Sequence, residues 1–142
     1  MKKCSVLLSL LLLLALCFSL ASCAGGGNVF ALLSVRLKGN GDGTVTAVAR
    51  NEFALSPAAL PVRLTLYVGA EAGDVSEMRV AGCAQTDDLG LFAALEVSVS
   101  VEEPAYYCAE IVYIVHGEEE ILQSGTVRYD ASGTRVADTR SM

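Results

Sequence analysis

Apolar and polar residues alternate along most of the chain, which is the pattern of β-strands that bury one face. Between Val62 and Val68, every second residue is Val or Leu, and the residues between them are Arg, Thr and Tyr. The segment 105–116 is instead apolar on both sides, as expected of a strand in the middle of a sheet. This pattern predicts seven strands, at Phe30–Lys38, Thr44–Glu52, Val62–Val68, Glu77–Gly82, Leu91–Glu102, Ala105–His116 and Glu120–Tyr129.

Short runs rich in Gly, Asn, Asp and Pro separate these strands and indicate turns and loops. The run Gly39–Gly43 holds one carboxylate, Asp42, whereas a calcium loop needs several, so we interpret this run as a turn. Two packed antiparallel sheets let each strand of this kind bury one face. We therefore predict an all-β antiparallel sandwich over residues 29–130, followed by a polar tail over residues 131–142.

The first 22 residues have a different pattern. A basic start, Met1-Lys2-Lys3, precedes an almost unbroken apolar run from Val6 to Leu20. This run is shorter than the ~20 apolar residues that a membrane-spanning helix requires. The combination is typical of a secretory signal peptide, here a short apolar helix that is removed from the mature protein. We therefore expect the chain to be exported.

The apolar run ends in Leu20-Ala21-Ser22-Cys23, which resembles the lipobox of bacterial lipoproteins. The resemblance implies cleavage before Cys23 and a diacylglyceryl thioether on its sulfur, with an N-acyl chain as a further modification of the new amine. Two or more acyl chains anchor a protein stably to a membrane. The alternative is an ordinary signal peptide cut near Ala21 or Ala24, which leaves Cys23 unmodified.

A short glycine-rich link, residues 23–28, joins the expected anchor to the domain. Four to six extended residues reach at most ~14–22 Å. The domain is therefore expected close to the membrane and outside the cytoplasm. Whether that membrane is the cell membrane or an outer membrane stays open.

Charge limits the classes of partner. The full chain has 10 basic and 16 acidic residues, and Lys2 and Lys3 leave with the signal peptide. Eight basic residues against sixteen acidic ones give the mature chain a net charge of −8. Such a surface repels nucleic acid and anionic lipid headgroups, so we expect no basic face to hold the domain at the membrane. We expect the lipid anchor to hold the protein at the membrane, and its partner to be an envelope protein or a surface glycan.

Two of the five cysteines lie in the leader, and Cys23 is the expected anchor. Cys83 and Cys108 remain. An even remainder in an exported chain favours a disulfide between them, with two free thiols as the alternative. A zinc site would need further ligands, and His116 is the one additional candidate, so we expect no metal and no cofactor besides the lipid.

The segment Tyr106-Tyr107-Cys108-Ala109 resembles the sixth strand of immunoglobulin domains, in which a tyrosine lies two residues before a cysteine. The resemblance implies an immunoglobulin-like sandwich and carries no function. The chain departs from that family because it has no tryptophan and its second strand has no cysteine. Alternation places Tyr107 and Ala109 toward the core and Cys108 and Glu110 on the outside, so a disulfide through Cys108 would lie on an outer face or an edge.

Catalytic motifs are absent from the sequence. The single histidine, His116, falls at the end of a predicted strand, and no G-x-S-x-G nucleophile motif is present. The carboxylate runs 87–88, 102–103 and 118–120 fall at predicted turns, where they serve solubility and protect strand edges. We therefore expect that the protein is not an enzyme.

Three functions remain, and each predicts a different structural feature. A non-catalytic binding or interaction module at the envelope would use an exposed edge, a sheet face or the loops. An accessory subunit of an envelope assembly or transport complex would expose a large apolar outer patch. A small hydrolase, the third hypothesis, would need a deep pocket lined by carboxylates.

Overall fold

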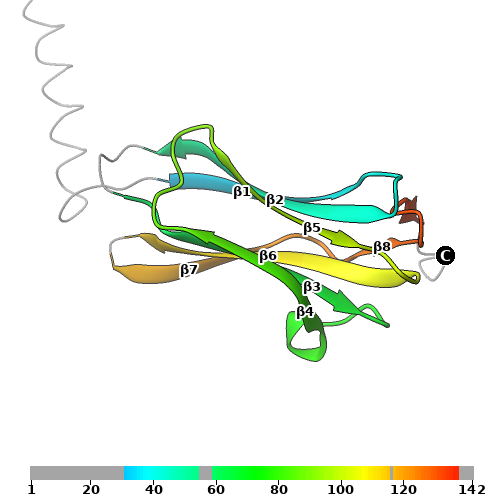
Figure 1. The fold of residues 1–142 in the computed structure, drawn as a ribbon. Helices are drawn as coiled ribbons and strands as arrows, with labels where there is room; N and C mark the ends of the chain where they lie inside the picture. The colour runs from blue at the N-terminus through cyan, green and yellow to red at the C-terminus, as the bar shows by residue number, and fades with distance from the viewer. Residues whose placement is uncertain (1–30, 55–58, 116, 138–142) are drawn as a thin grey trace, which may run out of the picture.

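Two antiparallel sheets face each other across the core (Figure 1). The computed structural model describes residues 31–54, 59–115 and 117–137. None of these segments forms a helix long and apolar enough to cross a membrane. They contain one short 3-10 helix, η1 (Val75–Glu77), and the strands β1 (Ala31–Gly39), β2 (Thr44–Ala54), β3 (Val62–Gly69), β4 (Arg79–Thr86), β5 (Ala94–Ser100), β6 (Ala105–Val115), β7 (Glu118–Gln123), β8 (Val127–Tyr129) and β9 (Arg135–Val136).

Sheet A consists of β1, β2 and β5 in that order. Sheet B has the order β4, β3, β6, with β7 and β8 both pairing with β6 and β9 pairing with β8. All of these pairings are antiparallel, so the predicted all-β sandwich is confirmed. The strand order differs from that of a constant-type immunoglobulin domain in two ways: β4 pairs with β3 in sheet B, whereas the fourth strand of such a domain pairs with the fifth, and β9 is an additional strand beside β8.

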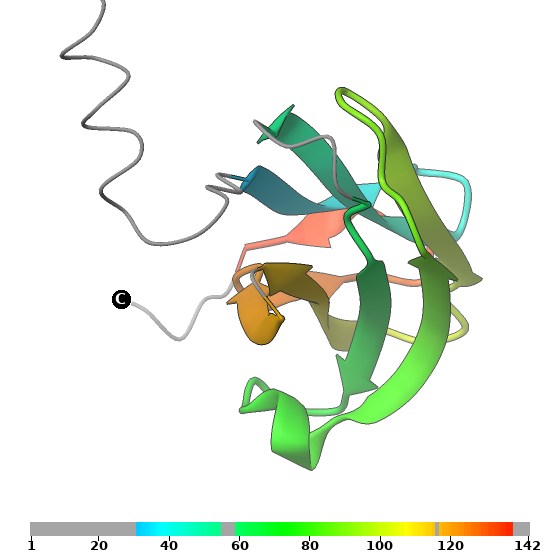
Figure 2. The same ribbon diagram turned by 90° about the vertical axis from the view of Figure 1, so that its left-hand side faces the viewer.

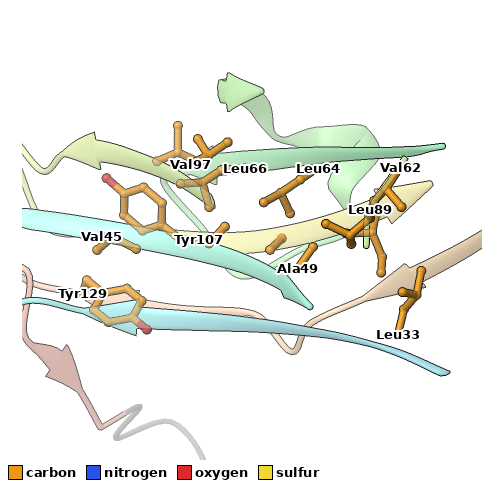
Figure 3. Close-up of a cluster of buried hydrophobic side chains, with 14 of the residues drawn as sticks. Leu33, Val45, Ala49, Val62, Leu64, Leu66, Leu89, Val97, Tyr107 and Tyr129 are labelled. Carbon is orange, nitrogen blue, oxygen red and sulfur yellow. The ribbon is translucent and has the colours of Figure 1, made fainter. Parts of the chain in front are cut away.

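Alternate residues of both sheets fill the space between them (Figure 3). Leu64 and Leu66 of β3 and Ile111 of β6 are fully buried. They belong to one core cluster with the inward residues of β2, which are Val45 and two alanines. Small residues on one sheet and large ones on the other allow the two faces to interdigitate at the density of a protein interior.

The central strand β6 has the register that alternation predicted. Tyr107, Ala109 and Ile111 belong to the core, whereas Cys108 and Glu110 lie on the other face. Cys108 is nevertheless buried, because the chain after β7 covers it: its Sγ lies 3.4 Å from the carbonyl oxygen of Ser124.

The last predicted strand is interrupted. Residues 124–126 between β7 and β8 face only two residues of β6, which makes a β-bulge. Ser124 supports this bulge because its N–H donates to the Ala109 carbonyl (2.8 Å) and its Oγ accepts the Ala109 N–H (2.9 Å). The hydroxyl thus replaces a backbone acceptor that a regular strand would supply.

Two other strands differ from their predicted bounds by more than two residues at one end. β4 begins later, at Arg79, because η1 occupies its expected start, and it continues past Gly82 to Thr86. Gly82 does not end the strand but allows it to approach β5, since a Cβ there would lie 2.6 Å from Cγ1 of Val97. β5 is shorter than predicted, because residues 91–93 belong to the loop before it.

The start of the expected polar tail is folded back onto the sheets. The N–H of Gly43 donates to the Ser132 carbonyl (2.7 Å), and β9 pairs with β8. One oxygen of Asp130 accepts the backbone N–H groups of Ser132 and Thr134. The hydrogen bond from the Ser132 hydroxyl, with those backbone bonds, lowers the pKa of Asp130 below its ordinary value. The sequence pattern did not predict that this segment is folded, because its turn consists of polar residues.

Gly133 provides a test of this C-terminal turn. It has a φ of +74°, and a Cβ there would collide with the backbone of Thr44. Gly41 has a similar φ of +71° but open space around it. We expect Gly41→Ala to lose about 1–2 kcal/mol of unfolding free energy from the left-handed backbone alone. Gly133→Ala should lose about 1–3 kcal/mol more from overpacking, as measured by urea denaturation. Equal losses in the two variants would mean that residues 130–134 do not pack on β2.

Candidate functional site

A cleft opens between the edges of the two sheets. Gly82 brings β4 against β5, and the cleft lies beside this contact, toward the end of the sandwich where β5 ends and β6 begins. The cleft has a volume of about 530 Å³. It lies at the opposite end of the molecule from Ala31, because β1 pairs with the end of β2 and β5 ends beside the start of β2. The volume is in the range of small-molecule sites.

The cleft has an apolar floor and a charged rim. Small and branched residues form the floor, among them Ala81, Val99 and Ala105. The rim carries Arg79 from β4 and two neighbouring glutamates from the turn between β5 and β6. This arrangement would fit a ligand that has both hydrogen-bond donors and acceptors for the rim and an apolar part for the floor. It would fit a simple anion or cation less well.

Tyr107 connects the cleft to the core. Its ring is 4% exposed and packs edge-on against Tyr129, with 5.9 Å between ring centroids. Burial is the main cause that raises the pKa of the Tyr107 hydroxyl, and the negative charge of Glu102 adds to it while Arg79 opposes it. Tyr107 thus belongs both to the core and to the lining of the cleft.

The arrangement of the cleft does not support hydrolysis. Glu102 and Glu103 are neighbours in one turn and both are exposed, whereas a glycosidase needs two carboxyls that flank the bond it cleaves. Among the described residues, no group of three His, Cys, Asp or Glu side chains could hold a metal ion.

Two predicted site residues lie outside the described part of the chain. These are Cys23, the expected lipid anchor, and His116. The carboxylate runs are exposed and lie apart: residues 87–88 follow β4 and residues 102–103 precede β6, outside the strands. The prediction of a turn at residues 118–120 is wrong, because these residues form the start of β7. Asp88 also has a structural role, because its Oδ1 accepts the N–H of Leu60 (3.2 Å).

The disulfide expected between Cys83 and Cys108 is absent, and both cysteines are free. Cys83 pairs with Thr65 of β3 on one side, and Cys108 pairs with Tyr67 of β3 on the other. Both thiols thus lie on the outer face of sheet B with β3 between them. Two strand spacings separate their backbones by roughly 10 Å, too far for a bridge. The even number of cysteines favoured a disulfide, but it could not show that β3 lies between the two strands that carry them.

The outer face of sheet B holds a second group of polar residues that sequence reasoning missed. Glu110 accepts hydrogen bonds from the Tyr67 hydroxyl (3.4 Å) and from the Gln123 side chain (2.6 Å). Burial and the Glu110 carboxylate raise the pKa of Tyr67. Beside this row, Ile114 and Ile121 are 43% and 60% exposed and form a small apolar patch. Alternation placed Glu110 outward but could not show which residues of other strands are its neighbours.

Comparison with known proteins adds little. No protein-family model and no curated protein matches the chain. Among solved structures, β-glucosidase 3B from Thermotoga neapolitana is similar over 75% of this chain and 18% of its own, with 14% identity and a TM-score of 0.36. The GH3 β-glucosidase from Bifidobacterium adolescentis is similar over 69% of this chain and 17% of its own, with 14% identity and a TM-score of 0.35. The chain spans less than a fifth of these enzymes, and similarity this weak carries no argument about function.

The two thiols should differ in their reactivity. Cys83 is exposed and Cys108 is buried. In the folded mature protein without reductant, we expect a maleimide to label Cys83 alone, and after denaturation to label both cysteines. Cys83→Ser should remove the fast label, which mass spectrometry would detect. A denatured protein that accepts no label until it is reduced would instead establish a disulfide.

Proposed function

We propose that this protein is a lipid-anchored, non-catalytic binding module of the bacterial envelope. The observation that carries the proposal is the sequence Leu20-Ala21-Ser22-Cys23 at the end of an exported leader, joined by a short link to a β-sandwich. Acylation of Cys23 would hold the domain outside the cytoplasm at a membrane surface. The cleft between β4 and β5 is the site we propose for its ligand.

The chemistry of the cleft supports binding over catalysis. Its rim has one guanidinium and two carboxylates, and its floor has an aromatic hydroxyl among apolar side chains. Such a surface suits a polar segment of an envelope protein or a glycan, whose hydroxyl and amide groups would face the rim charges. Small floor residues such as Ala81 and Ala105 leave the space that a ligand would occupy.

A second candidate function rests on the outer face of sheet B. The patch of Ile114 and Ile121 is bordered by the carboxylate of Glu119, which pairs with Ile114 on the same face. An apolar centre with a charged border is the composition of a protein–protein interface. This patch favours an accessory subunit that works inside an envelope complex, although its two main side chains make it small for such an interface.

Removal of the anchor tests the location directly. We expect Cys23→Ala to move the protein from the membrane fraction to the soluble extracytoplasmic fraction, because the variant has no sulfur to carry the diacylglyceryl group. Cys83→Ala is the matched control, since it removes an exposed cysteine of the mature domain and should leave the protein in the membrane. Immunoblots of the fractions provide the measurement. Membrane retention of Cys23→Ala to the same extent as the control would contradict lipid anchoring.

Filling the cleft tests the binding site. A photo-reactive amino acid at Glu103, on the rim, should form an adduct with the ligand in the native envelope. Ala81→Leu fills the floor and should abolish the adduct, whereas Val80→Leu changes an exposed neighbour on the outer face and should preserve it. Equal melting temperatures of the two variants would show that both are folded. An adduct that survives Ala81→Leu would exclude the cleft as the binding site.

A further inference from the structure

The outer face of sheet A has a charge opposite to that of the rest of the protein. The strand register places Arg36, Lys38 and Arg50 on this face, together with the carboxylates of Glu52 and Glu96. Three cations and two anions give the face a net charge of +1. The remainder of the mature chain, whose total is −8, therefore carries −9.

One of those carboxylates is already engaged within the face. Glu52 accepts a hydrogen bond from the Ser34 hydroxyl (2.9 Å) and lies 3.8 Å from Nε of Arg50. Among the described residues, Arg36 and Lys38 form no ion pair. They border a shallow hollow of about 470 Å³ on the outer side of β1 and β2. These two cations are thus available to an external anion.

An exposed apolar loop accompanies the cationic face. Leu91 and Phe92 are 51% and 61% exposed, and Phe92 has a φ of +62°, a conformation that residues other than glycine rarely adopt. The buried Asn51 of β2 holds this loop in place. Its carbonyl accepts the N–H of Phe92 (2.8 Å), its N–H donates to Ala93 (3.1 Å), and its side chain donates to the Leu89 carbonyl (2.8 Å). The strained backbone is therefore fixed so that it presents an aromatic ring to the exterior.

The loop and the start of β1 lie at the same end of the sandwich. In both views, the loop before β5 rises past sheet A on the side away from sheet B (Figures 1 and 2). Leu32, 53% exposed, lies at this end of β1. The proposed anchor at Cys23 is eight residues before Ala31, a distance of at most ~26–29 Å when extended. An anchored chain would hold this end of sheet A near the lipid.

We infer that sheet A, through its outer face and the loop 89–93, lies on an anionic lipid surface. This inference rests on the proposed anchoring at Cys23. Lipid phosphates attract the cations of Arg36 and Lys38, and the side chains of Leu91 and Phe92 enter the boundary between headgroups and acyl chains. Sheet B then faces away from the membrane, and the cleft lies between the sheets at the end of the sandwich opposite the start of β1.

The absence of tryptophan from the chain allows a direct test of this orientation. Three single-tryptophan variants replace side chains of matched exposure: Phe92→Trp (61%), Ile121→Trp (60%) on sheet B at the same end, and Val80→Trp (57%) on the outer face of sheet B. Each lipidated protein is reconstituted into vesicles of 70% phosphatidylcholine and 30% phosphatidylglycerol with brominated acyl chains. We expect the tryptophan at position 92 to be quenched at least about twofold more than the other two, because only this position reaches the acyl region.

The other outcomes show whether the anchoring or the orientation is wrong. Vesicle flotation of the same samples reports the anchor, and a protein that does not float would overturn both the anchoring and the orientation. A floating protein with equal quenching at positions 92 and 121 would mean that the domain meets the membrane end-on. No quenching at position 92 would mean that the domain stands away from the lipid. Either result would overturn this inference and leave the anchor intact.

The role of charge is tested in the Phe92→Trp background. Replacing Arg36 and Lys38 by Gln should reduce the quenching at position 92 about twofold in the anionic vesicles, because the attraction to phosphate is lost. The matched control replaces Arg63 and Arg128, which lie on sheet B, and should leave quenching unchanged. Equal effects of the two pairs would contradict a specific contribution of the cationic face.

Discussion

The packing of β2 against β3 and β6 determines which side of every strand faces outward. The two alanines of β2, Ala47 and Ala49, leave room for Leu64, Leu66 and Ile111, and all five are fully buried. Because side chains alternate along a strand, a shift of one residue would reverse every face at once. This core therefore places the cations of β1 and β2 on the outer face of sheet A. It places Tyr67 and Glu110 on the outer face of sheet B.

A single close approach between the sheet edges locates the cleft. Gly82 allows β4 to contact Val97 of β5, and the cleft lies between this contact and the turn that carries Glu102. The cleft is therefore a consequence of packing, with Tyr107 and small side chains at its floor. It lies at the opposite end of the sandwich from the start of β1, so anchoring through Cys23 would leave the cleft clear of the anchored end. The anchoring and the binding parts of the proposal are thus compatible in space.

The sequence predicted the fold better than it predicted the surfaces. Alternation identified the strands and the register of Tyr107 and Ala109, because both follow from burial of one face. It could not place Cys83 and Cys108 on either side of β3, since strand order depends on contacts between distant segments. It also missed the bulge at Ser124, where a hydroxyl replaces a backbone hydrogen bond. The cleft and the loop at Phe92 depend on packing and on backbone conformation, which leave no periodic signal.

The intact mass of the mature protein, purified from membranes, tests the central claim most directly. We expect a chain that begins at Cys23 and carries the added mass of a diacylglyceryl group, with or without an N-acyl chain. After mild proteolysis, the lipid should be found on the N-terminal fragment and the sandwich should carry none. An unacylated chain, beginning near Ala21 or at Ala24, would contradict lipid anchoring and the membrane orientation that depends on it.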